Sequence, residues 1–537
     1  MNSISRHTSR WSCLLIAFSC TLLLVPFLTA LEKSPFDNYS SYLGTNYDQE
    51  YRPKFHFTSR KNWINDPNGL LYYDGEYHLF FQHNPLGTGW GNMTWGHAIS
   101  TDMVHWQQME HAILPYGNGY VFSGTGVVDH NNSLGVQKGD TKTLVLLYSY
   151  AVDIRKNFGI LPPPAETCYY QGIAYSTDKG RTFTLLNDGA PVIPNQGKTV
   201  DPKGTERDPK LFWHEESKKW ITILWLGETS KGKVRFFTSD NLRDWAFASD
   251  MQRPWAHECF DLVHLDVYDD KGKKSGNKKW LIYDGNLDYE VGNFDGKAFH
   301  SQQKVRNHKI GHWNAAQTFN NSPDDRTVIM GWLVQGCFYR KRMPFAEQLS
   351  FPTTMHLRKQ GADHLLCRWP VDEIKSLYTK THTLPKNIKV EKANQNLKDI
   401  SADAMDITLS FEPKAKDLVF HMRGSTLTYQ AKDNKLSFLS ASYAQIQKRL
   451  AEMNEKERKR HRGKKNFLLP DAAIDGVVNV RILIDRGSFE IFLNGGVSVL
   501  TQSEISELDQ LSLFFSHNNT NAIINELIIH ELESSWK

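Results

Sequence analysis

Cysteine is scarce in this chain, and the few cysteines form no recognisable site. Six occur among 537 residues, and Cys13 and Cys20 fall in an apolar N-terminal segment. The other four lie far apart, without metal-ligand spacing. One disulfide between two of them is possible in an export compartment, but four cysteines do not make a disulfide scaffold for so long a chain. A hydrophobic core must therefore hold the fold, and we expect no metal site.

An excess of charge of one sign is also missing. The 63 basic and 59 acidic residues leave a formal net charge of +4, so charge gives no reason to expect a nucleic-acid partner. Residues 441–465, "ASYAQIQKRLAEMNEKERKRHRGKK", form a strongly basic insert. A solvated surface helix is the plain interpretation of this insert, and contact with an anionic surface or polymer is the alternative. A glycine-rich phosphate loop is absent too, and we expect no cofactor.

Long hydrophobic runs are limited to one, at the N-terminus. Arg6 and Arg10 precede the apolar residues 14–28, and the small residue Ala30 follows them. This order is typical of a secretory signal peptide cleaved near Ala30, which predicts a secreted protein without stable membrane insertion after cleavage. The alternative is an uncleaved membrane anchor, since residues 11–30 are just long enough to span a bilayer. Residues 31–49 would then form an N-terminal extension.

Stretches of helical period are almost missing between residues 50 and 355. Short apolar and aromatic runs broken by Asp-Gly, Asn-Gly and Ser-Asp predict an all-β fold with many hairpins. A faint repeat is present as "STDMVHW", "STDKGRTF" and "TSDNLRDW" in residues 100–106, 176–183 and 238–245. Its spacing of tens of residues indicates one four-stranded sheet per repeat, which is the layout of a β-propeller blade.

A second repeat places an acid before a strand, a polar hairpin turn and another strand. The acids are Asp66, Asp208 and Glu258, and we expect them in three successive units, at the entrance to each first strand. First strands of propeller blades line the central channel, so the three carboxylates would converge at one end of it. Their mutual repulsion would raise at least one pKa. The alternative is structural, with Asp66 and Asp208 as turn residues before proline and Glu258 as a surface acid.

Paired carboxylates without a metal cluster are the groups that glycoside cleavage uses. One acid attacks the anomeric carbon, and the other, kept protonated by its neighbours, donates to the leaving oxygen. Sugar sites also need aromatic platforms, and the chain contains 15 Trp. Most of these are core residues, and we assign only Trp63, Trp90 and Trp332 to a pocket.

Six ordered motifs resemble those of glycoside hydrolase family 32, which includes invertases, inulinases and levanases. They are "WINDPNG", "FQHNP", "WGNMTWGHAISTDMVHW", "FSGTG", "ERDPK" and "HEC-x-D", and the similarity continues through "MPFAEQLSFP" to "IDRGSFEIFLNGG". The resemblance implies a catalytic five-bladed β-propeller over residues 50–360 and a linker over 361–386. A β-sandwich would follow over 387–537, with strands such as "DLVFHMR", "VVNVRILID" and "SFEIFLNGG".

The resemblance also implies residue roles. Asp66 would be the nucleophile, Glu258 the general acid/base, and Asp208 the residue that stabilises the transition state. Five further positions fall on motifs that line a fructose pocket: Asn65, Gln82, Trp90, Ser123 and Arg207. Two departures are visible, Phe260 where Pro or Val is common and Thr125 where Ser is usual. We expect both to lie near enough to the pocket to alter which leaving group fits.

These observations predict a secreted, retaining β-fructofuranosidase that acts on sucrose or on fructans such as inulin and levan. One alternative is a fructosyltransferase, in which a second sugar takes the place of water with the same carboxylates. Another is a catalytically inactive propeller that only binds sugar. The sequence leaves open the preferred substrate, endo or exo attack, and the oligomeric state.

Overall fold

The computed structural model describes residues 44–117, 119–152, 168–197, 200, 204–227, 231–336, 338–444, 455 and 467–536. Short antiparallel strands dominate these residues, and α1 (Val390–Leu397) is a two-turn helix. None of the helices in this part of the chain is long and apolar enough to cross a membrane. The expected signal peptide, the extension up to residue 43 and most of the basic insert lie outside the described residues.

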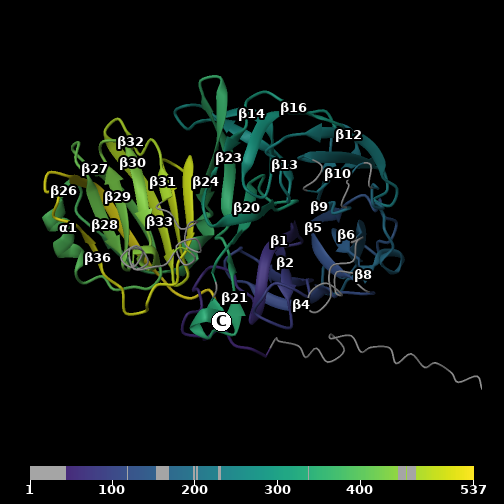
Figure 1. Ribbon diagram of the computed structural model, residues 1–537, viewed down its shortest axis with the longest axis horizontal. Helices are drawn as coiled ribbons and strands as arrows, with labels where there is room; N and C mark the ends of the chain where they lie inside the picture. The colour runs from purple at the N-terminus through teal and green to yellow at the C-terminus, as the bar shows by residue number, and fades with distance from the viewer. Residues whose placement is uncertain are drawn as a thin grey trace, which may run out of the picture. The chain divides into compact units, whose positions relative to one another are not determined.

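The N-terminal part of the described chain consists of sheets that each contain four consecutive antiparallel strands (Figure 1). In the first sheet, β21 (Phe345–Ala346) adds a short parallel strand beside β1. The first contains β1 (Asn62–Tyr73), β2 (Glu76–Asn84), β3 (Thr94–Ser100) and β4 (Gln107–Ile113). The second contains β5 (Tyr120–Asp129), β6 (Thr143–Ala151), β7 (Tyr169–Ser176) and β8 (Thr184–Leu185). The third contains β9 (Arg207–His214), β10 (Lys219–Trp225), β11 (Lys233–Ser239) and β12 (Ala246–Gln252). In each sheet, strands that follow one another along the chain are paired.

Two more sheets complete the five blades of a β-propeller. The fourth contains β13 (Asp261–Tyr268), β14 (Lys274–Tyr283), β15 (Asp288–Phe294) and β16 (Phe299–Ser301). The fifth contains β19 (Trp313–Thr318), β20 (Thr327–Leu333), β23 (Thr353–Gln360) and β24 (Asp363–Pro370). A short parallel pairing of β13 with β23 joins these two blades. Among the first strands, β5 contacts β1 and β9, and β19 contacts β1 and β13. An ion pair between Lys210 of β9 and Asp261 of β13 completes the ring, as expected for strands around a channel.

The repeat seen in the sequence forms the same turn in three blades, between the third and fourth strands. In the first blade Asp102 Oδ1 accepts backbone N–H groups of Val104 at 2.9 Å and His105 at 2.8 Å. Asp178 and Asn241 accept equivalent backbone donors in the second and third blades. A short polar side chain that bonds the backbone ahead of it is what an Asx turn requires. The predicted layout of one four-stranded sheet per repeat is therefore confirmed.

The C-terminal part is a β-sandwich. One sheet is built mainly from β25 (Tyr378–Thr383), β27 (Met405–Glu412), β33 (Val477–Asp485), β34 (Ser488–Leu493), β35 (Ser498–Ser503) and β37 (Ile523–Leu532). The other contains β28 (Leu418–Met422), β29 (Ser425–Gln430), β30 (Lys435–Leu439), β31 (Phe467–Leu469) and β36 (Leu513–Phe515). The three strands expected from the sequence correspond to β28, β33 and β34.

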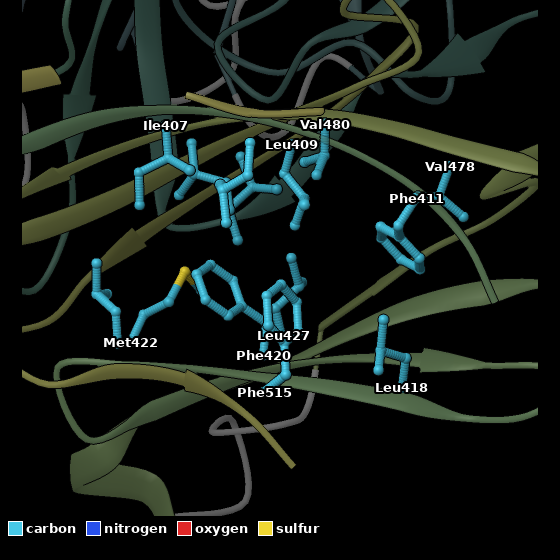
Figure 2. Packing of buried hydrophobic residues seen from close by; sticks show 14 of the residues in the cluster. Ile407, Leu409, Phe411, Leu418, Phe420, Met422, Leu427, Val478, Val480 and Phe515 are labelled. Carbon is cyan, nitrogen blue, oxygen red and sulfur yellow. The ribbon is translucent and has the colours of Figure 1, made fainter. Parts of the chain in front are cut away.

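Alternating apolar residues of the two sheets form the sandwich core. Ile407, Leu409 and Phe411 point from β27 toward the other sheet, and Phe420 and Met422 of β28 point back at them (Figure 2). Every second residue of a strand lies on the same face, so this spacing buries one face of each sheet. The polar residues between them are half-buried, on the opposite face.

The expected linker, residues 361–386, contains paired strands. Within it, β24 pairs with β23 of the fifth blade, whereas β25 pairs with β37 of the sandwich. The chain therefore passes from one sheet system to the other in the short stretch between them, a 3₁₀ helix at Asp372–Leu377. In the described residues, the buried Cys259 and Cys367 form no disulfide.

A buried carboxylate ties the start of the propeller to the sandwich. Asp485, at the end of β33, accepts the backbone N–H groups of Lys54, Phe55 and His56 and the ring Nδ1 of His56 at 2.9 Å. Burial alone would lower the pKa of His56, but hydrogen bonds and charges from Asp485 and Glu490 outweigh it and raise that pKa to about 9. Burial would raise the pKa of Asp485, whereas His56 and the backbone donors lower it to about 2.

Asp485→Asn should destabilise the protein by roughly 3–5 kcal/mol, because it removes the nearer carboxylate from a buried imidazolium and leaves Glu490 Oε1, 3.5 Å from His56 Nε2, to offset the charge. The His56 contribution is complete below its unfolded pKa and is lost as the pH rises through about 9, whereas the Asp485 contribution is lost as the pH falls toward 2. Denaturant unfolding near pH 6 measures the loss. Asp475→Asn, at an exposed turn before β33, is the control and should change stability little. Equal stability of the two variants would contradict this account.

Candidate active site

Each of the three predicted acids sits where the backbone of a blade is irregular. Asp66 lies in β1, where the pairing with β2 shifts register between Ile64 and Pro67. Asp208 is the second residue of β9 and has φ of +61°, in the left-handed region. Glu258 comes directly before Cys259, which has φ of +58° and leads into β13. Such conformations cost energy in non-glycine residues and concentrate at functional sites.

The acids do not come from three successive units, and this expectation was wrong. The blade of β5–β8 lies between those that carry Asp66 and Asp208, and β5 contacts both β1 and β9. Its first strand carries Ser123 near the channel entrance instead of an acid. Below the acids, the buried Lys210 of β9 pairs with the buried Asp261 of β13 at 3.0 Å, which fixes these two strands together.

The acids meet in one pocket of about 340 Å³. Of the ten predicted site residues, nine line it: Asn65, Asp66, Gln82, Trp90, Ser123, Arg207, Asp208, Glu258 and Trp332. Trp63 supports the wall from behind, since its Nε1 donates to Asn65 Oδ1 at 2.9 Å and its ring meets that of Trp332 at 5.9 Å. In the described residues, no group of three or more His, Cys, Asp or Glu side chains could hold a metal ion.

Two donors hold the carboxylate of Asp66. Ser123 Oγ donates to Oδ2 at 2.7 Å, and Asn65 Nδ2 donates to Oδ1 at 2.9 Å. Burial and then the charge of Glu258 raise the pKa of Asp66 to about 6, while these two hydrogen bonds and Arg207 oppose the shift. At neutral pH Asp66 is therefore ionised, with both oxygens oriented.

A thiol and a guanidinium link the three carboxylates. Cys259 Sγ lies 3.8 Å from Asp66 Oδ2 and 3.6 Å from Asp208 Oδ2. Arg207 Nη2 donates to Glu258 Oε2 at 2.6 Å, and its Nε lies 3.6 Å from Asp208 Oδ2. Cys259 thus bridges Asp66 and Asp208, and Arg207 bridges Asp208 and Glu258. The three carboxylates are therefore close enough to surround one small ligand.

The environments of the other two acids differ. Asp208 is buried, and burial is the largest cause that raises its pKa; Arg207 opposes this shift, and the charges of Glu258 and Asp66 add to it. The side chain of Glu258 is 25% exposed at the pocket. Its backbone is anchored because Gly285 N donates to Glu258 O at 2.8 Å and His257 N donates to Asp284 Oδ2 at 3.1 Å.

Four residues of the site were not predicted. Phe122, Tyr169 and Met93 line the pocket, and Cys259 bridges two carboxylates. The rings of Trp90 and Phe122 lie 6.0 Å apart and those of Phe122 and Tyr169 5.4 Å apart, so together they form an aromatic wall. Phe122, Met93 and Cys259 fall inside quoted motifs and could have been found there, whereas Tyr169 lies in none.

The two departures from the family motifs point away from the pocket. Thr125 is fully buried, and its hydroxyl donates to the backbone carbonyl of Pro209, which joins β5 to β9. Phe260 packs in the apolar cluster of the third and fourth blades. Neither side chain lines the pocket. Thr125 and Phe260 can therefore alter which leaving group fits only through the residues they pack against.

Comparison with known proteins decides the family. A model described as "Glycosyl hydrolases family 32 N-terminal domain" matches residues 56–370, and one described as "Glycosyl hydrolases family 32 C terminal" matches residues 373–531. The chain belongs to glycosyl hydrolase family 32. This family 32 chain is 33% identical to a levanase of Bacillus subtilis over 522 residues, which cover 91% of this chain and 72% of the levanase.

Two further comparisons agree in family and fold. An extracellular exo-inulinase of Aspergillus awamori is 30% identical, over 91% of this chain and 96% of the relative. The crystal structure of exo-inulinase from Aspergillus awamori superposes with a TM-score of 0.75 at 27% identity, over 91% of this chain and 100% of that one. The resemblance to family 32 and the fold of propeller followed by sandwich are therefore confirmed, and the chain is a glycoside hydrolase.

Asp208→Asn should stabilise the protein at neutral pH by about 1–3 kcal/mol. Burial raises the pKa of Asp208, so its ionisation weakens the fold progressively as the pH rises above the ordinary carboxyl range. The gain should be largest near pH 8 and vanish near pH 4, as measured by thermal unfolding. Asp240→Asn, at an exposed ion pair with Lys219, should change stability little at either pH. If the Asp208→Asn variant were less stable than the parent at pH 8, this would contradict the claim that burial raises the pKa of Asp208.

Proposed function

We propose that this family 32 β-fructosidase hydrolyses terminal fructosyl units of sucrose and of fructans such as inulin and levan, with retention of configuration. The observation that carries the proposal is the convergence of Asp66, Asp208 and Glu258 on one pocket through Cys259 and Arg207. The activities named for the relatives, levanase and exo-inulinase, support the substrate class.

The reaction would run in two displacements. In the first, a carboxylate oxygen of Asp66 attacks C2 of the fructosyl unit, the bond from C2 to the glycosidic oxygen breaks, and Glu258 gives its proton to that oxygen. The product is a fructosyl ester on Asp66 and a free leaving group. In the second, the Glu258 carboxylate takes a proton from water, the water oxygen attacks C2, and the ester bond breaks.

The remaining residues would bind and orient the sugar. Asn65 and Ser123 hold the two oxygens of Asp66 in place, which avoids reorganisation at the moment of attack. We assign Asp208 to the fructose hydroxyls and to stabilisation of the transition state. Gln82, Trp90 and Trp332, on the pocket lining, would complete the fructose site. Arg207 offsets the charge of Glu258 when the latter has lost its proton.

We further propose that the protein is exported and that residues 1–30 are removed near Ala30. The name of the Aspergillus awamori relative, an extracellular exo-inulinase, supports export. The catalytic propeller, expected over residues 50–360, would continue through β24 to residue 370, and the sandwich, expected over 387–537, would begin with β25 at residue 378. Sucrose and soluble fructans outside the cell would then reach the pocket directly.

Purified protein incubated separately with sucrose, inulin and levan tests the proposal. We expect fructose to be released from at least one of them, with fructose as the single small product from a fructan if attack is exo. Longer oligosaccharides from concentrated sucrose would favour the fructosyltransferase alternative. Failure to release fructose from any of the three would leave a protein that only binds sugar and would overturn the proposal.

A further inference from the structure

A second pocket, of about 260 Å³, is lined by residues of both the propeller and the sandwich. On the propeller side its lining comes from β15, β23, β24 and the segment around β17 (Arg306–Asn307). On the sandwich side it comes from the hairpin of β34 and β35 and from the loop after β31. None of the described residues that line the active-site pocket lines this one. We call it the interdomain pocket.

Backbone contacts fix the two walls of the interdomain pocket together. The strand that follows β17, β18 (Lys309–Gly311), pairs in parallel with β35 of the sandwich. Arg368 N donates to Gly496 O at 3.0 Å. Gly496 has φ of +85°, and a Cβ there would lie 1.8 Å from Arg368 O, so only glycine fits. The pocket is therefore preformed, and a ligand in it would contact both domains.

Guanidinium groups line the interdomain pocket on the propeller side. Arg358 of β23 forms no ion pair with any described residue, and its side chain has one hydrogen bond there, from Nη1 to Asn494 O at 3.4 Å. Arg306 pairs with Asp363 through Nη2 at 2.8 Å, which leaves Nε and Nη1 without an acceptor in the described part of the chain. Since a guanidinium carries five N–H donors, both side chains keep donors for a ligand.

A buried imidazole without a partner lines the same pocket. His308 is 5% exposed, and its Nε2 has no hydrogen-bond partner among the residues that the structure describes. Burial and then the charge of Arg368 hold the pKa of His308 well below its usual range, so the ring is neutral and can donate from one nitrogen. Arg368 is itself buried, and its Nε and Nη1 have no partner among the described residues either. Buried donors without acceptors are costly, so their concentration here points to a ligand that accepts hydrogen bonds.

We propose that the interdomain pocket binds a phosphate group, either as inorganic phosphate or as a small phosphomonoester. Two arginines line it, and of the described residues in its lining Asp471 is the one acid. The charge of Arg368, which acts on His308, adds to the positive potential. Guanidinium groups bind phosphate oxygens through charge-assisted hydrogen bonds. A tetrahedral oxyanion presents oxygens in several directions, which suits donors that come from separate strands.

The acceptors in the lining distinguish phosphate from other oxyanions. Asn494 Nδ2 donates to the backbone carbonyls of Asp471 at 3.0 Å and Ala472 at 3.2 Å, which fixes the orientation of the amide. Its Oδ1 is buried and has no donor among the described residues. At neutral pH phosphate carries a hydroxyl hydrogen that this oxygen can accept, whereas sulfate carries none and would leave it unpaired. The pocket should therefore prefer phosphate to sulfate.

Isothermal titration calorimetry of the whole purified protein at constant ionic strength tests the proposal. We expect inorganic phosphate to bind with a dissociation constant of about 1 mM or below, and sulfate to bind at least about tenfold more weakly. Arg358→Gln and Arg306→Gln should each weaken phosphate binding roughly tenfold, through the loss of a charge-assisted hydrogen bond. Both arginines are partly exposed, so the two variants should stay folded.

A second titration identifies the source of the phosphate group. Glycerol 3-phosphate that binds at least as tightly as inorganic phosphate would indicate a phosphomonoester as the ligand. Weaker binding of glycerol 3-phosphate would indicate the free ion. Loss of either titration in Arg358→Gln assigns the binding to the interdomain pocket.

Arg181→Gln is the matched control, because Arg181 is a partly exposed arginine of the second blade that pairs with Glu76 and is not in the lining of the interdomain pocket. It should bind phosphate as the parent does. Equal affinities for phosphate and sulfate, or an unchanged affinity for phosphate in both pocket variants, would overturn the proposal. Phosphate binding that is abolished by fructose but not by Arg358→Gln would place the ion in the active-site pocket and would overturn it as well.

Discussion

Asp66→Asn abolishes fructose release from sucrose, with kcat lower by roughly 10⁴-fold or more, while the protein stays folded. The amide keeps the size and shape of the carboxylate but cannot form an ester with C2 of the fructosyl unit. Its oxygen can still accept from Asn65 Nδ2, and its NH₂ group can donate to Ser123 Oγ, which stands 2.7 Å from Oδ2 in the parent. Steady-state kinetics and thermal unfolding measure the two effects.

Asp74→Asn is the control for this variant. Asp74 lies in the turn between β1 and β2, half-exposed, where it pairs with Lys179 at 2.5 Å. Its replacement should leave kcat within about twofold, because Asp74 does not line the active-site pocket. It should also leave the protein folded, because a surface ion pair contributes little to stability. A folded Asp66→Asn variant with a near-normal rate would contradict the assignment of Asp66. Unfolding of that variant alone would instead support the interpretation of Asp66 as a structural turn residue.

Glu258→Gln lowers kcat for sucrose by about 10²–10⁴-fold, the usual contribution of a general acid. Gln cannot supply a proton, but its carbonyl oxygen can still accept from Arg207 Nη2, which lies 2.6 Å from Glu258 Oε2 in the parent. A leaving group that needs no proton should escape much of this loss in the first step. We therefore expect p-nitrophenyl β-D-fructofuranoside to give a burst of p-nitrophenol with the variant.

Azide provides the second readout for Glu258→Gln. As an anion it needs no general base, so it should restore turnover of the aryl fructoside and yield fructosyl azide. Glu215→Gln, in the exposed turn after β9, is the control and should behave as the parent. An equal loss with sucrose and with the aryl fructoside, and no effect of azide, would show that Glu258 does not transfer the proton.

Local sequence signals predicted much of the fold. The turns after the third strand of a blade were visible because Ser-x-Asp and its variants bond their own backbone, as Asp102 and Asp178 do. The pairing of β24 with the fifth blade and of β25 with β37 was not visible. β37 follows β25 by well over a hundred residues, and such a register depends on long-range packing that no local pattern encodes.

The acids of the site were predictable for a similar reason, since each lies within a motif at the start of a blade. The groups that connect them were harder to predict. The bridging position of Cys259 depends on its left-handed backbone at φ of +58°, which the residue type does not indicate. Tyr169 reaches the pocket from the first residue of the third strand of its blade, outside any motif. The turn repeat at residues 176–183 marked the blade of β5–β8, but the acid repeat passed over this blade because its first strand carries Ser123 instead of an acid.

The stereochemistry of transfer to methanol tests the central claim most directly. Sucrose turned over in aqueous methanol gives some methyl fructofuranoside, whose anomeric form is read by carbon NMR. Two displacements, through an ester on Asp66, predict the methyl β-fructofuranoside alone. The α anomer as the first product would mean a single displacement and would contradict the roles given to Asp66 and Glu258.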